Sequence, residues 1–290
     1  MISAAANKTA LTPSDREKLA LILLLGDDDP AVYQAVRARI LESGQAAVEW
    51  LLPHTLSGDP PVRRHASEII QHLRRETADD RFLAFCLTEG NDLNLEQGAW
   101  LLAKTRYPDI NVEAYQALFD SFAGDLLERI DLRGDADHVL GAFNEYVFEV
   151  LKFHGNEENY YDPENSYLNR VVDRRTGNPI NLCLFYLLLA RRLRLPMTGI
   201  GLPGHFICRY QSTSEEYYVD VFNRGKFWTR ANCVQHLIQR NYNVQDQHLA
   251  PVSSRRMLCR ICGNLRQIYQ QRGMDADALR LQRYLVALAK

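Results

Sequence analysis

The residues best suited to chemistry by type and position are a histidine and an aspartate on neighbouring predicted strands. Residues 205–210 and 217–222 carry the β-branched and aromatic side chains that strands favour, and the polar residues between them form a loop. If Tyr210 pairs with Tyr217, then His205 and Asp220 become diagonal neighbours on one face of the hairpin. A slip of two residues would make them direct partners, so either register lets the imidazole meet the carboxylate.

A second chemical candidate is the pair Cys259 and Cys262, which have the spacing of half a zinc site. No second Cys/His pair at matching spacing follows, and on a helix the two residues share a face, which favours core packing. The sequence also has no glycine-rich phosphate loop and no His-Glu-x-x-His motif. We therefore expect neither a metal nor a cofactor.

A buried helix is predicted directly before the strands. It opens at Gly177-Asn178-Pro179, where Asn178 can cap the free N–H groups and Pro179 fits the first helical position. Its body, to about Leu193, is apolar almost all round. Such a helix should lie in the middle of a domain.

The N-terminal residues 1–90 are expected to be helical, with an internal repeat of 30 residues. Asp29-Pro30 recurs as Asp59-Pro60, and Asp followed by Pro is a strong helix start. The repeat resembles HEAT-like units, which must stack to bury their faces, with a plain helical bundle as the alternative. The apolar positions that follow also align, Val36 with Ala66 and Ile40 with Ile70.

The C-terminal residues 251–290 have a helix–glycine–helix rhythm around Gly273 that looks like one tetratricopeptide-type unit. Residues 91–250 form the expected core between the two helical ends. The predicted fold class is α+β and mostly helical. It has N-terminal α-helical repeats, a core with a small antiparallel sheet, and tetratricopeptide-like C-terminal helices.

A run of short motifs crosses residues 153–223, namely Tyr160-Tyr-Asp-Pro-Glu-Asn-Ser, Arg175-Thr-Gly-Asn-Pro-Ile, Gly201-Leu-Pro-Gly-His-Phe and Asp220-Val-Phe-Asn. Together they resemble the bacterial SirB-type family, a branch of the transglutaminase-like superfamily. The resemblance covers roughly residues 93–290 and implies a transglutaminase-like, papain-like core. The N-terminal helical repeats are not part of the family's usual pattern.

Enzymes of this superfamily carry a Cys, His, Asp triad, with the Cys in a Gly-x-Cys at the start of a buried helix. The resemblance places the His at His205, the Asp at Asp220 and the Gly-x-Cys at Gly177-Asn178-Pro179. A proline has no side-chain nucleophile. We therefore expect a non-catalytic pseudoenzyme that acts as a protein-interaction or regulatory scaffold.

The alternative is a cysteine-dependent acyl-transfer or hydrolytic enzyme. Cys183 lies one helical turn after Pro179 on a similar face. In this reading Cys183 is the nucleophile, His205 the base and Asp220 the group that orients it. The other interpretation is that Cys183 fills a small-residue slot against the sheet, where burial raises the pKa of its thiol.

The irregular segment before the helix supplies candidate ligand-binding groups. They either line a cleft together with His205 or satisfy the backbone of their own loop. These residues are Tyr161, Asp162, Asn165, Asn169 and Arg175.

Composition indicates which classes of partner and which cellular compartment suit this chain. A net charge of −2 over 290 residues gives no field for nucleic acid or an anionic membrane. The longest apolar run near the N-terminus, residues 19–25, is far shorter than the roughly 20 residues of a membrane span, and no signal peptide is apparent. Six scattered cysteines in apolar surroundings fit reduced thiols in the cytoplasm. We expect a cytoplasmic chain with a protein partner.

Overall fold

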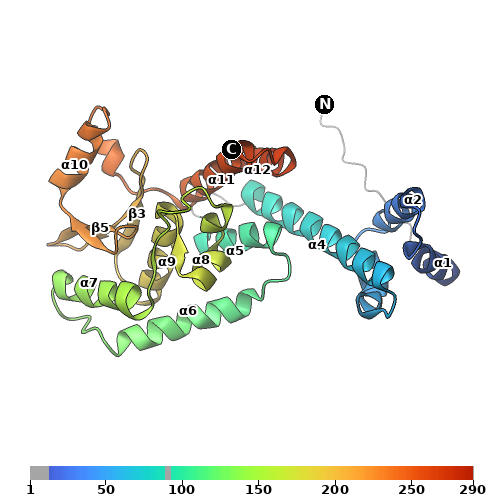
Figure 1. Cartoon of the computed structure of the whole chain (residues 1–290). Helices are drawn as coiled ribbons and strands as arrows, with labels where there is room; N and C mark the ends of the chain where they lie inside the picture. Colours follow the sequence, from blue (N-terminus) through green and yellow to red (C-terminus); the bar gives the residue numbers. More distant parts are fainter. Residues whose placement is uncertain (1–12, 89–92, 290) are drawn as a thin grey trace. The chain divides into compact units, whose positions relative to one another are not determined.

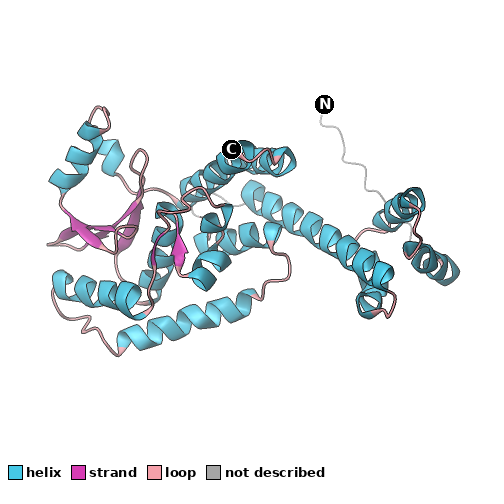
Figure 2. Cartoon of the chain, in the orientation of Figure 1, coloured by secondary structure: helices cyan, strands magenta, loops and turns pink. Residues whose placement is uncertain are grey.

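The computed structural model describes residues 13–88 and 93–289 as packed helices with a small sheet (Figures 1 and 2). Unit 1 contains the described residues up to Arg81 together with Lys104–Asp109. Unit 2 contains the described residues of Phe82–Ala103 and Ile110–Lys290. The boundary at residue 90 predicted from the sequence lies outside the described residues, and helix α4 (Pro60–Thr88) runs without a break past Arg81.

Local capping rules explain where the helices of unit 1 begin. Ser14 caps α1 (Asp15–Leu25) by accepting the N–H of Glu17. Asp29 caps α2 (Pro30–Leu41) by accepting the N–H of Ala31 at 2.8 Å, with Pro30 at the first position. The short helices α3 (Ala46–Leu51) and η1 (Leu52–Leu56) follow, and α4 again starts at a proline after an aspartate.

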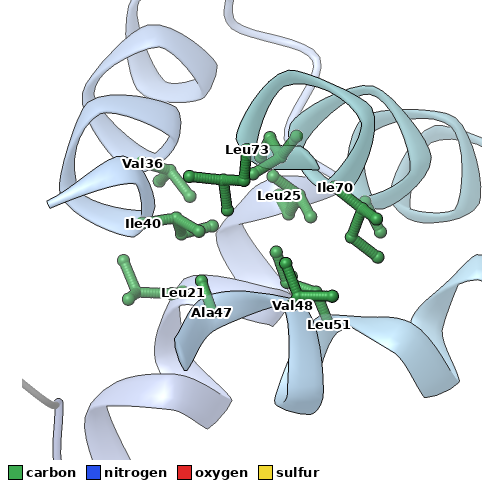
Figure 3. Close-up of a cluster of buried hydrophobic side chains, with 11 residues drawn as sticks. Leu21, Leu25, Val36, Ile40, Ala47, Val48, Leu51, Ile70 and Leu73 are labelled. Carbon is green, nitrogen blue, oxygen red and sulfur yellow. The ribbon is translucent and has the colours of Figure 1, made fainter. Parts of the chain in front are cut away.

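One apolar core holds unit 1 together. Figure 3 shows Leu21 and Leu25 from α1 with residues from α2, α3 and α4 around a common centre. All four positions aligned by the 30-residue spacing are buried in this core: Val36, Ile40, Ala66 and Ile70. His65 adds a polar tie, because its Nδ1 lies 2.8 Å from the carbonyl oxygen of Leu25.

Helix α9 (Pro179–Arg192) is the central element of unit 2. Asn178 caps it by accepting the N–H of Asn181 at 3.0 Å, as the sequence predicts. Eleven of its 14 residues are buried. Phe185 stacks on Phe153 at a centroid separation of 4.0 Å and packs against Phe119 of α6 (Val112–Leu127).

A four-stranded antiparallel sheet follows α9, shown in magenta in Figure 2. Its order is β3 (Met197–Ile200), β4 (Ile207–Gln211), β5 (Glu216–Asp220) and β6 (Lys226–Trp228). Tyr210 pairs with Tyr217, which is the first of the two registers considered from the sequence. The fold is thus α+β and mostly helical with a small antiparallel sheet, as predicted.

More helices complete unit 2. On the N-terminal side of α9 are most of α5 (Leu95–Arg106), then α6, α7 (Ala136–Asn144) and the π-helical turn η2 (Glu145–Val150). After the sheet come α10 (Arg230–Gln239) and η4 (Asp246–Leu249). The chain closes with α11 (Ser254–Gln271) and α12 (Asp275–Leu288), a hairpin that turns at Gly273 with φ 68°.

Residues 153–178 are more ordered than their turn-rich sequence indicates. They contain η3 (Pro163–Ser166), α8 (Leu168–Arg174), and a parallel pair formed by β1 (His154–Gly155) and β2 (Thr176–Gly177). Two-residue strands and a two-turn helix are too short to produce a clear periodic signal. None of the described helices is both long and apolar enough to cross a bilayer.

The core of unit 1 provides a matched test of packing. Leu25 is fully buried and Leu23, on the same helix, is 79% exposed. We expect Leu25→Ala to lower the free energy of unfolding by about 2–5 kcal/mol, because it removes apolar burial and leaves a cavity. Leu23→Ala should change it by less than about 0.5 kcal/mol. Urea denaturation of the full chain, with hydrogen exchange in unit 1, measures both, and equal effects would contradict this core.

Candidate functional site

A cavity of about 630 Å³ lies in unit 2 where the first residues of α9 meet the sheet, α10 and α11. Its volume is in the range of small-molecule sites, about 300–1,000 Å³. The start of α9 contributes Asn178 and Pro179, and the turn before β4 contributes His205. The cavity therefore contains the His position and the helix start that the sequence singles out.

His205 and Asp220 form a short hydrogen-bonded pair at this cavity. The Nε2 of His205 lies 2.9 Å from Oδ1 of Asp220. The carboxylate is fully buried, and Asn223 donates to it through Nδ2 at 2.7 Å and through its backbone N–H at 3.3 Å. With Nε2 engaged, Nδ1 is the imidazole nitrogen left for a ligand, since no hydrogen bond joins it to the described residues.

The turn that presents His205 depends on a glycine. Gly204 has φ 71°, a left-handed conformation that glycine adopts without strain. The turn closes with a hydrogen bond from the His205 N–H to the Leu202 carbonyl at 3.1 Å. Arg260 of α11 holds the same turn by donating from Nη2 to the carbonyls of Leu202, at 2.9 Å, and His205, at 2.7 Å. Arg260, 55 residues away in the sequence, therefore holds the backbone of the turn that carries the His205 imidazole.

The start of α9 lacks the groups that thiol catalysis needs. Pro179 lines the cavity with His205, but it carries neither a nucleophile nor a backbone N–H. Backbone N–H groups at the first turn of a helix bind anions, and a thiolate is favoured at the same place. Position 179 supplies neither a thiol nor an N–H of its own.

Cys183, the alternative nucleophile, is fully buried and is not part of the cavity lining. Its thiol donates to the carbonyl of Phe206 at 3.4 Å. Burial raises the pKa of the Cys183 thiol well above its usual range, and the neighbouring Cys208 and Asp220 add to the effect. The structure thus places Cys183 in the core between α9 and β4, with a neutral thiol.

Of the predicted cleft residues, Tyr161 and His205 line the cavity and four do not. Asp162 caps η3 and forms an ion pair with Arg174 at 2.7 Å. Asn165 is fully buried and donates to the carbonyls of Asn159 and Tyr160. These two residues shape the loop that carries Tyr160 and Tyr161.

Asn169 and Arg175 also face protein instead of the cavity. Asn169 is buried in α8. Arg175 ends α8 in a left-handed conformation with φ 55°, and its guanidinium lies 5.0 Å from the ring centroids of both Phe122 and Phe153. Burial lowers the pKa of Arg175. Its contacts therefore join α8 to the aromatic core.

Several residues of the cavity were not anticipated from the sequence, and four of them lie at His205 or at the turn that carries it. Trp228 ends β6, His236 lies on α10, Arg240 is the C-cap residue that follows α10, and Arg260 lies on α11. His236 and Arg240 are four residues apart, which places them on one helical face. That spacing was the available signal, but nothing local shows that this face meets the His205 turn.

Two of these side chains, those of His236 and Trp228, lie close to the His205 ring. The ring centroids of His205 and His236 are 5.8 Å apart, and Trp228 lies 5.9 Å from His205 and 5.3 Å from His236. Burial is the main cause that lowers the pKa of His236, and Arg240 and His205 lower it further. The His236 imidazole is therefore neutral near pH 7, and its Nε2 is buried without a hydrogen-bond partner.

The described residues bring no three His, Cys, Asp or Glu side chains together in a way that could hold a metal ion. Cys262 is fully buried on α11, and burial raises the pKa of its thiol well above the usual range. Cys259 is partly exposed on the same helix. The spacing of these two cysteines thus coincides with a helix that packs on the core of unit 2.

Comparison with known proteins adds a family match. Residues 113–263 match the transglutaminase-like superfamily. A UPF0162 protein of Xylella fastidiosa strain 9a5c is 36% identical over 186 residues, which are 61% of this chain and 65% of that protein. F-box only protein 21 of Homo sapiens is 29% identical over 248 residues, which are 73% of this chain and 38% of that protein.

Coverage limits what these relatives say about the whole protein. The chain spans just under two thirds of the length of the Xylella protein. A UPF0162 protein of Pseudomonas aeruginosa is 30% identical over 121 residues, 44% of its length. No solved structure matches the chain significantly.

The burial of Cys183 leads to a labelling prediction. We expect iodoacetamide near neutral pH to modify Cys183 in the folded chain at least about a hundredfold more slowly than in urea, because each unit of pKa elevation lowers the thiolate fraction tenfold. Peptide mass spectrometry follows each cysteine, and partly exposed Cys259 serves as the internal control. Rapid labelling of Cys183 in the native chain would contradict its placement.

Proposed function

Because the chain belongs to the transglutaminase-like superfamily, we propose that it is a non-catalytic member that acts as a protein-interaction or regulatory scaffold around a binding cleft. The observation that carries this proposal is Pro179. It stands at the first position of α9, inside the cavity that also contains His205. Thiol acyl transfer needs a nucleophile at that point, because the base must take its proton within hydrogen-bond reach.

The position of Cys183 supports the same proposal. Under the enzymatic alternative, Cys183, His205 and Asp220 would form the triad. The Cys183 thiol is instead buried and bonded to the Phe206 carbonyl, and burial holds its pKa high. Attack by Cys183 would require both a change in its hydrogen bonding and access of substrate to the core.

The His205–Asp220 pair has a role without a nucleophile. Removing one member of a buried, hydrogen-bonded pair leaves the other polar group unsatisfied, which costs several kcal/mol. The pair thus stabilises the β4–β5 hairpin end and holds the His205 ring at the cavity. A rigid polar group at the wall of a cavity is what a binding site requires.

Exposed apolar residues on unit 1 support a protein partner. Leu19 and Leu23 of α1 are 63% and 79% exposed, and their spacing of four places them on one helical face. Side chains of this kind on stacked, HEAT-like helices suit recognition of another protein. We propose that this partner binds at α1. A separate proposal concerns the compartment: all six cysteines are unpaired, which suits the reducing cytoplasm.

The first test restores the missing thiol. In Pro179→Cys the new side chain lies at the helix N-terminus in the same cavity as His205, so we expect a pKa below the usual value of about 8.5. Iodoacetamide should label it at neutral pH at least about tenfold faster than any native cysteine. Mass spectrometry of the full chain gives the rates.

Two control variants show whether the fast labelling depends on His205 and on the new thiol. Pro179→Cys combined with His205→Ala should lose much of the acceleration, and Pro179→Ser should label like wild type. Acyl-ester hydrolysis by the wild-type chain that disappears in Cys183→Ser would overturn the non-catalytic proposal in favour of the enzyme.

The second test addresses the partner. We expect Leu19→Glu with Leu23→Glu to reduce cross-linking of the full chain to its main protein partner in cells, because charge on this face opposes apolar contact. Leu279→Glu, at an exposed leucine of α12, is the matched control and should leave the cross-link unchanged. Equal amounts of cross-linked partner with the wild-type chain, the Leu19→Glu/Leu23→Glu chain and the Leu279→Glu chain would exclude α1 as the contact surface.

A further inference from the structure

The cavity contains more positive charge than its own residues neutralise. Arg240 and Arg260 both line it. The guanidinium of Arg240 lies against Gly204, in the space that a Cβ would occupy, and Nη1 of Arg260 would lie 3.2 Å from a Cβ on Gly201. The two arginines thus contact the same turn, the one that presents His205.

Neither arginine has a carboxylate partner among the described residues. Arg260 donates to the carbonyls of Leu202 and His205 and lies 5.4 Å from the Phe206 ring centroid. Burial lowers the pKa of Arg260, so the charged form is under-stabilised where it lies. Arg230, at the start of α10, which Arg240 caps at its C-terminus, is by contrast paired with Asp246 at 2.8 Å.

The single acidic residue of the lining cannot serve a ligand. Asp220 is fully buried, and its carboxylate already accepts hydrogen bonds from His205 and Asn223. The start of α9 adds the positive end of its helix dipole to the same cavity. A cationic ligand would therefore face two arginines with no free carboxylate, whereas an anion would pair with them.

The remaining lining specifies the rest of the ligand. Asn264 and Gln267 of α11 offer amides, while Tyr160, Phe222 and Trp228 offer aromatic surface. Tyr160 packs edge-on to Phe222 at 6.0 Å, which leaves a wall of rings beside the polar groups. A site of this composition suits a molecule with a charged end and an apolar or aromatic body.

We propose that this cavity binds a small organic anion, whose carboxylate or phosphate pairs with Arg240 and Arg260 while its aromatic or apolar body contacts Trp228 and Tyr160. The inference rests on the proposed binding role of the cleft and names the class of its ligand. A guanidinium donates two parallel hydrogen bonds to either anion, so the shared chemistry is an oxyanion.

Four probes of nearly equal size test the charge preference: benzoate, phenyl phosphate, benzamide and benzamidine. We expect ligand-observed NMR and calorimetry with the full chain to detect both anions, more strongly than benzamide, and to detect no benzamidine. The ratio of benzoate to phenyl phosphate affinity then separates a carboxylate source from a phosphate source. Inorganic phosphate should compete with both.

Variants locate the site. Arg240→Gln should weaken anion binding about tenfold, the loss expected for one charge-assisted pair. Arg230→Gln, a matched change on α10, should leave binding at the wild-type level. Because Arg260 also holds the Leu202–His205 turn, Arg240 is the decisive position and Arg260→Gln only a supporting one.

Three results would overturn the inference. Benzamide or benzamidine binding as well as the anions would reject the charge preference while leaving a binding cleft in place. Anion binding that survives Arg240→Gln undiminished would reject this site. No binding of any probe at millimolar concentration would reject the ligand class, and the labelling of Pro179→Cys decides the non-catalytic proposal separately.

Discussion

Burial of α9 on all sides is the constraint on which unit 2 depends. A helix with apolar residues round its whole circumference must be covered everywhere, so helices and the sheet pack around it. Eleven of its 14 residues are buried. The same constraint decides the chemistry, because it fixes the helix N-terminus at the cavity and encloses Cys183 in the core. A ligand in the cavity can therefore reach Pro179, at the start of α9, but not Cys183, one turn further along the same helix.

The cavity combines a hydrogen-bonded His–Asp pair with a helix start that carries no thiol. The turn at Gly204, the His205–Asp220 bond and the capped start of α9 provide the geometry that a thiol enzyme would use. Pro179, at the first position of α9, carries neither a thiol nor a backbone N–H. What remains is a wall of fixed polar groups, and its charge comes from Arg240 and Arg260, which no residue of a triad would supply.

Unit 1 is stabilised in a different way, without a central helix among its described residues that is buried on all sides. Its helices are held by one apolar cluster to which each of α1 to α4 contributes, and polar contacts such as Arg39 with Glu17 and His65 with the Leu25 carbonyl add to it. Leucines on the outer face of α1 remain exposed. The superfamily match, residues 113–263, lies wholly outside this unit. The proposed partner surface and the proposed ligand cavity therefore lie in different units of the chain.

The sequence by itself determined the elements whose signals are local. Asn178 and Asp29 marked helix starts through capping, and the apolar body of α9 indicated its burial. Strand patterning predicted the hairpin but left two registers open, and the structure decided for the pairing of Tyr210 with Tyr217. Only the tertiary structure decided which residues beyond His205 and Asp220 line the cavity. Asp162, Asn165 and Arg175 contact their own loop or the aromatic core, and Asn169 is buried in α8 outside the cavity lining. His236, Arg240 and Arg260 instead line the cavity together with His205. Helical and strand periodicity fixes the face on which a residue lies, but the neighbour of that face is set by packing between segments far apart in the chain.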